Sequence, residues 1–244
     1  YRTGKFQFSN KLSIDWLETA NPVVSFADYA YANPYYRKSD ARYLYYPEEG
    51  IDDYPVANPL WNAGLNNWDK ANGFGFTNNF IFEWFMAESL RMRAKFGLTK
   101  SGDTEQMRLS PLHTSFDDVG ETEKGLYSHT RIDQIAYEGD VSLTFGKVLA
   151  DKHQLNAVGG FNFSASNQQV YGYSANGFTD DQFDAPSFAN GYPADDKPDY
   201  SESMKRAASF YINGGYVYDD RYLADFNYRL DGASMFGTGN RFRN

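Results

Sequence analysis

The sequence predicts an all-β fold: a segment of an antiparallel transmembrane β-barrel, with about seven strands and long loops at one end. Three observations predict it. Hydrophobic residues alternate with polar ones over long stretches, short and long connections alternate along the chain, and aromatic residues stand at the ends of the apolar stripes. Together they favour a sheet whose apolar face meets lipid over a sheet packed on a second one.

The alternation is most regular in the segment 74–99. Its even positions are apolar on both sides of a short turn, whereas its odd positions are polar or small for most of the length. Because successive strand side chains point to opposite faces, this segment is a hairpin with one aromatic-rich face and one basic face. The apolar positions are Phe74, Phe76, Phe80, Phe82, Trp84, Leu90, Met92, Ala94, Phe96 and Leu98.

The same period predicts about seven strands of roughly ten residues or more, long enough to cross a bilayer at a tilt. They cover residues 5–17, 74–85, 90–100, 133–146, 153–168, 203–218 and 221–233.

The connections between these strands alternate in length without exception. The short ones are 86–89, 147–152 and 219–220, and the long ones are 18–73, 101–132 and 171–202. Every short turn therefore falls at one end of the sheet, as in outer-membrane barrels with short periplasmic turns and long extracellular loops. A sandwich with Greek-key crossings has no reason to sort its loops in this way.

Aromatic residues stand at both ends of the apolar stripes, as the interfacial girdles of a barrel require. Trp84, Tyr218 and Tyr222 flank short turns, and Trp16 and Phe74 border the first long loop. The alternative is that large aromatic residues occupy half-buried strands of any sheet. An odd number of strands would leave two unpaired edges, so we expect the chain to be part of a larger barrel.

Composition excludes several classes of function. The net charge of −9 argues against nucleic acid as a partner, and the absence of cysteine excludes disulfides, thiolate metal sites and cysteine nucleophiles. The mean hydropathy is −0.64, and no run of about 18 apolar residues could form a membrane helix. The chain opens without a signal sequence, so for an exported protein we expect that signal upstream.

Motifs for covalent chemistry are missing from the sequence. It contains no Walker loop, dinucleotide fingerprint, nucleophile elbow or HExxH, and its three histidines lack ligand spacing. Acid pairs occur at 117–118, 180–181 and 195–196, where we expect solvated loop charge over a calcium loop. The sequence therefore predicts no enzyme, no cofactor and no metal.

Two groups of residues are candidates for a functional site. On the polar face of the strands, mixed charge suits a barrel lumen that is hydrated or filled by a plug, although ordinary solvent exposure would look the same. The lumen-facing candidates are Arg91, Arg93, Lys95, Asp225 and Arg229.

The second group lies in the aromatic-rich first long loop. Such a loop could form a stacking platform for a sugar or an anchor for a partner protein, or its aromatic residues could pack the loop on itself. The candidates for contact with a substrate or a lid protein are Tyr35, Tyr36, Arg37, Trp61 and Trp68.

Five stretches of the chain resemble the SusC/RagA-type TonB-dependent nutrient transporters of Bacteroidetes outer membranes. They are ANPYYR at 32–37, YPVANPLWNA at 54–63, GFGFTNNF at 73–80, GYSANGFTDDQFDAPSFANGYP at 172–193 and YRLDGASMFGTGNRF at 228–242. The last is similar to the family's YR-x-DGSS-x-FG-x-x-x-R-(F/W) signature, which Ala233 and Met235 vary while the charged and glycine positions are kept.

The resemblance implies a 22-stranded barrel in the cell outer membrane, with residues 1–244 as part of its barrel domain. It also implies a plug domain outside this chain, a SusD-like surface lipoprotein as a lid and energy from the TonB complex. The imported nutrient would be a glycan or a peptide. The alternatives are a passive porin or adhesin barrel and a secreted carbohydrate-binding β-sandwich.

Overall fold

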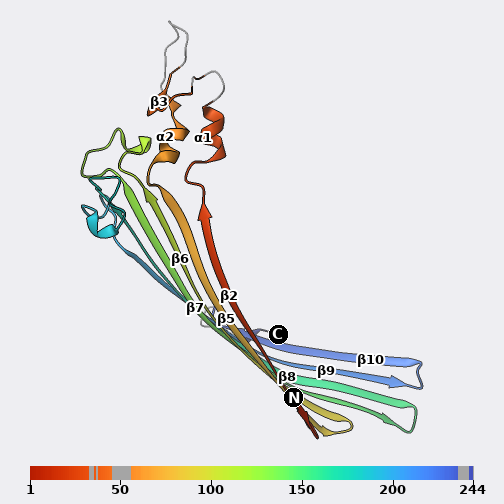
Figure 1. Ribbon diagram of the computed structural model, residues 1–244. Coiled ribbons are helices and arrows are strands. Elements are labelled where there is room, and N and C mark those ends of the chain that lie inside the picture. The colour runs from red at the N-terminus through yellow and green to blue at the C-terminus, as the bar shows by residue number, and fades with distance from the viewer. Residues whose placement is uncertain (33–35, 37, 46–55, 236–241, 244) are drawn as a thin grey trace.

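A computed structural model of the chain describes residues 1–32, 36, 38–45, 56–235 and 242–243. In this part of the chain, nine strands form one antiparallel sheet in the order β1-β2-β5-β6-β7-β8-β9-β10-β11 (Figure 1). The strands are β1 (Arg2–Thr3), β2 (Phe6–Asn21), β5 (Trp68–Ala87), β6 (Leu90–Leu109), β7 (Leu126–Leu149), β8 (His153–Asn176), β9 (Asp199–Tyr218), β10 (Tyr222–Ala233) and β11 (Phe242–Arg243).

All seven predicted strands are present, and the predicted fold class is confirmed. The strands are nevertheless longer than predicted at the ends that join the long loops: β6 runs to Leu109 instead of residue 100, and β7 starts at Leu126 instead of residue 133. The pairing continues there through polar residues, because a backbone ladder needs no hydrophobic alternation. The two-residue strands β1 and β11 carry too short a pattern to be predicted.

The short connections are tight hairpin turns. In the turn between β9 and β10, Asp219 and Asp220 have φ of 51° and 53°, and the Arg221 amide donates to the Tyr218 carbonyl at 3.0 Å. The turn between β7 and β8 repeats this geometry at 150–151, with φ of 49° and 53°. Positive φ at both central residues is typical of a type I′ turn, whose twist matches that of the flanking strands.

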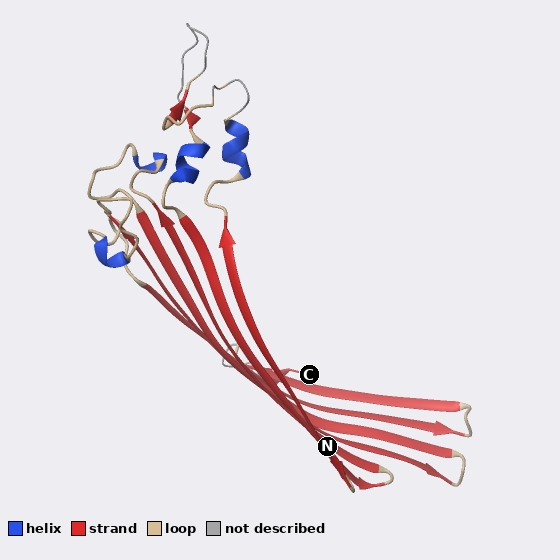
Figure 2. Ribbon diagram, viewed as in Figure 1, coloured by secondary structure: helices blue, strands red, loops and turns tan. Residues whose placement is uncertain are grey.

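Helices occur at the opposite end of the sheet, among the long loops (Figure 2). Helix α1 (Phe26–Tyr31) starts at a capping box between Ser25 and Asp28, and α2 (Pro59–Gly64) starts at Asn58, whose side chain accepts from the Leu60 amide. The remaining loop elements are β3 (Tyr43–Leu44), β4 (Val56–Ala57), η1 (Thr114–Phe116) and η2 (Pro186–Phe188).

The register separates an apolar face from a polar face across the whole sheet. One row of paired residues is apolar on all seven long strands, and the adjacent row on the other face is mostly polar. The apolar row is Phe8, Phe82, Ala94, Val141, Phe161, Phe210 and Leu230. The polar row is Gln7, Glu83, Arg93, Ser142, Gly160, Tyr211 and Arg229. The face that contains each row is called the apolar face and the polar face below.

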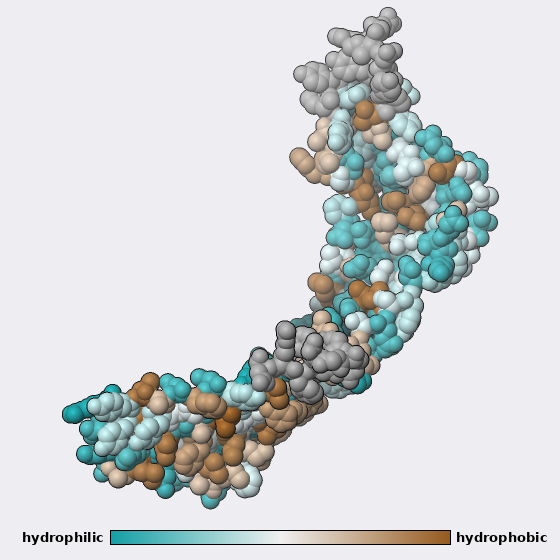
Figure 3. All heavy atoms as spheres, turned by 180° about the vertical axis from the view of Figure 1, so that it is seen from behind, coloured by the Kyte–Doolittle hydropathy of each residue, from teal (hydrophilic) through white to brown (hydrophobic). Residues whose placement is uncertain are grey.

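The sheet has no second layer over its apolar face in the part of the chain that the structure describes. The chain exposes 16788 Å², whereas a compact monomer of its mass would expose about 11,000 Å². Apolar side chains gather on the arm that carries the short turns (Figure 3), and Phe226 is 61% exposed there. The only other described sheet is the two-stranded β3–β4, so a β-sandwich does not fit.

The upper boundary of the apolar face slants across the strands. It lies at Trp16 in β2 but at Leu230 in β10. The paired residues that start at Trp16 lead across the sheet to Glu202 on β9. Glu202 lies eight residues before Phe210, which pairs with Leu230. Over six strand spacings this shift corresponds to an angle of about 40° between the strands and the normal to the apolar band. Strands of closed barrels tilt by this amount.

Candidate functional site

The five charged residues predicted to face a lumen share the polar face. Arg91, Arg93 and Lys95 are alternate residues of β6, and Asp225 and Arg229 have the same orientation on β10. Arg91 and Asp225 form no ion pair with any residue that the structure describes.

Ion pairs between neighbouring strands surround a shallow depression on the polar face. Arg93 Nε lies 3.6 Å from Glu83 Oε1, and Lys95 Nζ lies 3.0 Å from Glu138 Oε1. The depression has a volume of about 550 Å³ and is also lined by Asp140. The Lys95–Glu138 pair is exposed and adds little stability, whereas Glu83 is half-buried beside a partly exposed Arg93. The charged side chains make this a surface with both hydrogen-bond donors and hydrogen-bond acceptors.

A tyrosine extends this polar patch across three strands. Tyr211 on β9 pairs with Gly160 on β8, and its hydroxyl donates to Asp140 Oδ2 on β7 at 3.2 Å. The Tyr211 ring lies over Gly160, where an added Cβ would be 2.4 Å from the ring. Glycine is therefore needed for the ring to lie flat enough to reach Asp140. On the next strand Arg229 holds Asp231 at 2.8 Å and 3.0 Å.

The second site is a cluster in which three loops interlock around Arg108, near the end of β6. The guanidinium is completely buried and donates to the carbonyls of Asp181 at 3.0 Å, Phe183 at 2.9 Å and Asn66. Asn66 belongs to the loop 22–67, and the other two partners to the loop 177–198. One side chain thus joins both loops to the sheet. Because its charge is buried, the loss of any one of these partners would cost free energy.

Further contacts hold the third loop, 110–125, to this cluster. The amides of Gly177 and Phe178 donate to the Lys124 carbonyl at 3.0 Å and 2.8 Å. Phe178 is 1% exposed, lies under the Arg108 guanidinium at 5.8 Å and packs on Gly125. Gly125 has φ of +79°, and a Cβ there would be 3.1 Å from the Phe178 ring. The three loops therefore share one small core.

Asparagine side chains connect α2 to the same core. Asn62 Nδ2 donates to Thr114 Oγ1 at 2.9 Å, and Asn67 Oδ1 accepts from the Ser110 amide at 2.7 Å. Asn58, which is 1% exposed, donates to the Ser39 and Ala41 carbonyls at 2.8 Å and 2.6 Å. Loops lack the regular backbone hydrogen bonds of a sheet. These asparagine side chains provide hydrogen bonds to the loops in their place.

The aromatic residues predicted for substrate or lid contact take part in this packing. Trp61 on α2 donates from Nε1 to the Leu112 carbonyl at 3.3 Å. Trp68 is the first residue of β5, on the apolar face, and packs edge-on against Tyr127 at 6.0 Å. Tyr36 lines a depression of about 280 Å³ between α1 and α2, and Tyr35 and Arg37 lie outside the described residues. Trp61 and Trp68 thus contact another loop and a neighbouring strand, and the binding role stays a prediction.

Two of the predicted solvated acid pairs have partners within the loops. Asp117 contacts both Arg42 and the Tyr43 hydroxyl, and Asp181 accepts from the Asn66 amide at 3.2 Å and lies 3.8 Å from Arg108 Nη1. The expectation of solvated charge is therefore wrong for these two residues. Their partners are far away in sequence, so the composition around each acid pair could not predict these contacts.

Sequence reasoning missed Arg108 altogether. A signal existed, because Arg108 stands at an even position of β6 and so continues the parity of the apolar stripe. A cation at such a position must be exposed to headgroups, or buried with partners. The structure shows the second case.

A histidine makes the loop 110–125 sensitive to pH. His113 Nδ1 accepts from the Ser115 amide at 3.1 Å and so caps η1, and burial lowers the pKa of His113 below its usual 6.5. Below pH 6.5 the unfolded loop binds a proton that the folded loop rejects, so the stabilisation present above this pH is lost as the pH falls. We expect hydrogen-exchange protection factors in this loop to drop between pH 7 and pH 5.

Replacing His113 with asparagine should remove this pH dependence. The amide keeps a capping acceptor but does not titrate. Protection factors, corrected for intrinsic exchange, should then be equal at the two pH values. An equally large drop in His113→Asn would mean that another group controls the loop.

No protein-family model matches the chain. TonB-dependent receptor P26 of Formosa agariphila is 22% identical over 188 residues, which cover 77% of this chain and 19% of the receptor. The RagAB peptide transporter superposes with a TM-score of 0.69 and 18% identity, over 82% of this chain and 21% of that one. The chain therefore shares the fold of a segment of that transporter's barrel wall, and it is called the wall segment below.

The wall segment spans about a fifth of the length of these relatives. It also superposes on the RagAB peptide importer in its 'closed-closed' and 'open-open' states, with TM-scores of 0.69 and 0.68. Within the described residues no helix is long and apolar enough to cross a membrane, and no group of three or more potential metal ligands gathers.

Proposed function

We propose that the wall segment belongs to an active importer that carries a nutrient across the outer membrane with energy from the TonB complex. The observation that carries this proposal is the match of 77% of the chain to a TonB-dependent receptor. The relation of the apolar and polar faces supports it, because an importer wall needs lipid on one side and a polar interior on the other. No covalent chemistry is part of this function.

The polar face would line the lumen and meet the plug domain outside this chain. Mixed charge suits a contact that must form and separate, because exposed ion pairs stabilise weakly and exchange readily with water. Arg91 and Asp225, which have no ionic partner among the described residues, would be available to such a plug or to passing substrate.

The substrate would be a glycan or a peptide, captured between the loop cluster and a SusD-like surface lipoprotein. The RagAB structures are of a peptide transporter, which supports the peptide class. The aromatic and amide groups of the loops suit either class.

Uptake measured in whole cells tests this proposal. Cells that produce the full-length protein should accumulate labelled oligopeptides or oligosaccharides, and deletion of TonB should abolish the uptake. Uptake that persists without TonB would favour the passive porin instead. A lipoprotein should co-purify with the full-length protein in mild detergent, and its absence would contradict the lid.

The role of the loop tryptophans needs a separate test. The double substitution Trp61→Ala and Trp68→Ala should weaken binding of substrate or lid protein and leave barrel assembly, judged by heat-modifiable migration on gels, intact. A Trp61→Phe variant loses the hydrogen bond to Leu112 but keeps an aromatic ring, so it separates loop packing from stacking. Unchanged affinity in the double variant would exclude both residues from the binding site.

A further inference from the structure

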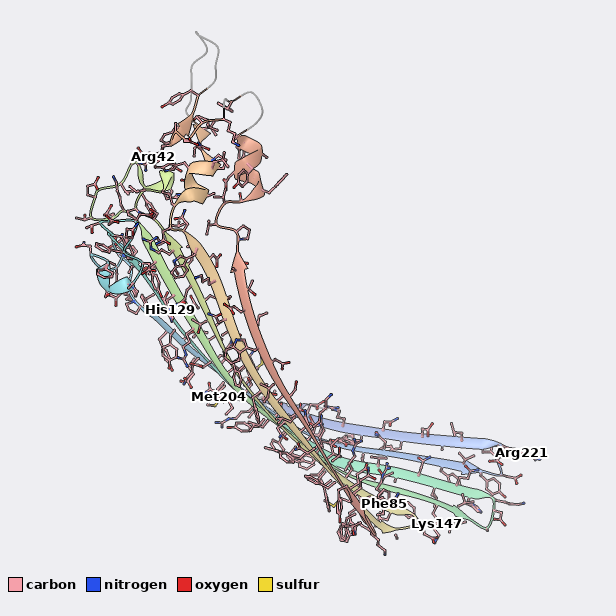
Figure 4. All side chains as sticks on the ribbon, viewed as in Figure 1. Arg42, Phe85, His129, Lys147, Met204 and Arg221 are labelled. Carbon is pink, nitrogen blue, oxygen red and sulfur yellow. The ribbon has the colours of Figure 1, made fainter. Side chains whose placement is uncertain are left out.

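A mostly polar collar extends the apolar face of β6, β8 and β9 toward the long loops, and it includes the apolar residues Ile135 on β7 and Met204 on β9 (Figure 4). On β6 the last apolar residue of this face is Leu98 and the next is Lys100, and on β9 Arg206 precedes Ala208. Its polar residues include Lys100, Gln169, Tyr171, Tyr200, Glu202 and Arg206. These side chains point to the same side of the sheet as the apolar face, with Lys100 and Arg206 nearest to it and Tyr171 and Tyr200 farther toward the long loops.

The centre of the collar offers flat aromatic and hydrogen-bonding groups. The rings of Tyr171 and Tyr200 contact each other at a centroid distance of 5.0 Å and are 42% and 56% exposed. Tyr200 donates to Glu202 Oε2 at 3.1 Å, and Tyr171 donates to Gln169 Oε1 at 3.2 Å. Aromatic faces beside fixed carboxylate and amide groups are the arrangement that binds sugar rings and their hydroxyls.

Two cations lie between this centre and the apolar face, four residues along β6 and six residues along β9 from the row that pairs Tyr171 with Tyr200. Lys100 and Arg206 are exposed, and neither forms an ion pair with any residue that the structure describes. They are three strands apart, a separation of about 14 Å. By contrast, Arg131, which pairs with Tyr171, is neutralised by Asp133 at 2.8 Å and 3.1 Å. Lys100 also lines a depression of about 320 Å³ beside Gln169.

We propose that the collar binds the phosphorylated sugar headgroup of an outer-leaflet glycolipid. Phosphate would meet Lys100 and Arg206, sugar rings would stack on Tyr171 and Tyr200, and acyl chains would lie on the apolar face below. A headgroup without sugar would leave the exposed faces of the tyrosine rings uncovered. This inference rests on the proposed outer-membrane position of the sheet but not on TonB coupling. Glycolipid binding and TonB-dependent import can therefore fail independently of each other.

Glycolipid retained by the purified full-length protein tests the proposal. The protein in detergent is incubated with purified lipopolysaccharide or with the same material after enzymatic dephosphorylation, and bound glycolipid is counted by native mass spectrometry after size exclusion. Wild type should retain the phosphorylated form and lose the dephosphorylated one. Because this comparison needs no variant, equal retention of both forms would overturn the proposal.

A variant pair locates the site on the sheet. Lys100→Gln with Arg206→Gln should lower retention of the phosphorylated form by roughly tenfold, since each cation near an anionic surface contributes to binding. The matched control is Lys205→Gln, the neighbour of Arg206 that points to the polar face, and it should retain the glycolipid like wild type. An equal loss in the control, or no loss in the double variant, would contradict the assignment.

Discussion

A Phe226→Arg substitution is expected to destabilise the folded barrel in lipid by about 2 to 4 kcal/mol. Phe226 lies at the middle of the apolar stripe of β10 and is 61% exposed. In a bilayer the new guanidinium would be surrounded by hydrocarbon, and its desolvation is the source of the cost. The free energy of unfolding of the full-length protein, measured by denaturant titration in lipid vesicles, gives this number directly.

The adjacent position provides the control. Asn227 points to the polar face of the same strand and pairs with Asn213. Asn227→Arg adds the same side chain at the same depth, so it should cost much less if that face is hydrated. Equal destabilisation by the two substitutions would show that the assignment of the two faces is wrong.

Replacement of Arg108 with methionine should release the loop cluster. Methionine fills much of the same space but leaves the carbonyls of Asn66, Asp181 and Phe183 without this donor, at a cost of about 3 kcal/mol or more. Because the partners lie in loops, we expect the loss to appear as local opening. Protease cleavage and hydrogen exchange within 60–67 and 177–198 should rise, while the strands stay protected.

An exposed arginine serves as the reference for this substitution. Arg131 has the same orientation on β7 and pairs with Asp133, but its side chain is 59% exposed. Arg131→Met should leave loop protection unchanged. If Arg108→Met also leaves the loops protected, the guanidinium does not hold them together.

Two-residue periodicity was sufficient to predict the strands and their shared faces. The segment 74–99 carries its pattern locally, and the pairing of Phe82 with Ala94 and of Glu83 with Arg93 follows once the turn is placed. The pattern ended where the apolar face ends, so the polar extensions of β6 and β7 were missed. Those extensions are held by pairing with neighbours, which a single strand's sequence does not express.

The loop cluster was beyond prediction for a different reason. Arg108 gains its partners from Asn66, Asp181 and Phe183, which are 42 to 75 residues away in sequence. Trp68 was predicted as part of a loop, but β5 already starts there, so its ring is fixed beside Tyr127. Composition identified the loops as aromatic and polar, and only the fold decides which of these side chains remain available to a ligand.

The orientation of the two faces is tested most directly by lipid accessibility along one strand. The chain has no cysteine, so single cysteines can be introduced in β10 of the full-length protein, labelled with a fluorophore and exposed to nitroxide-bearing lipids in vesicles. The positions are Ala224, Asp225, Phe226, Asn227, Tyr228 and Arg229. The account predicts strong quenching at the even positions and little at the odd ones. Quenching without a two-residue period, or stronger at the odd positions, would contradict it.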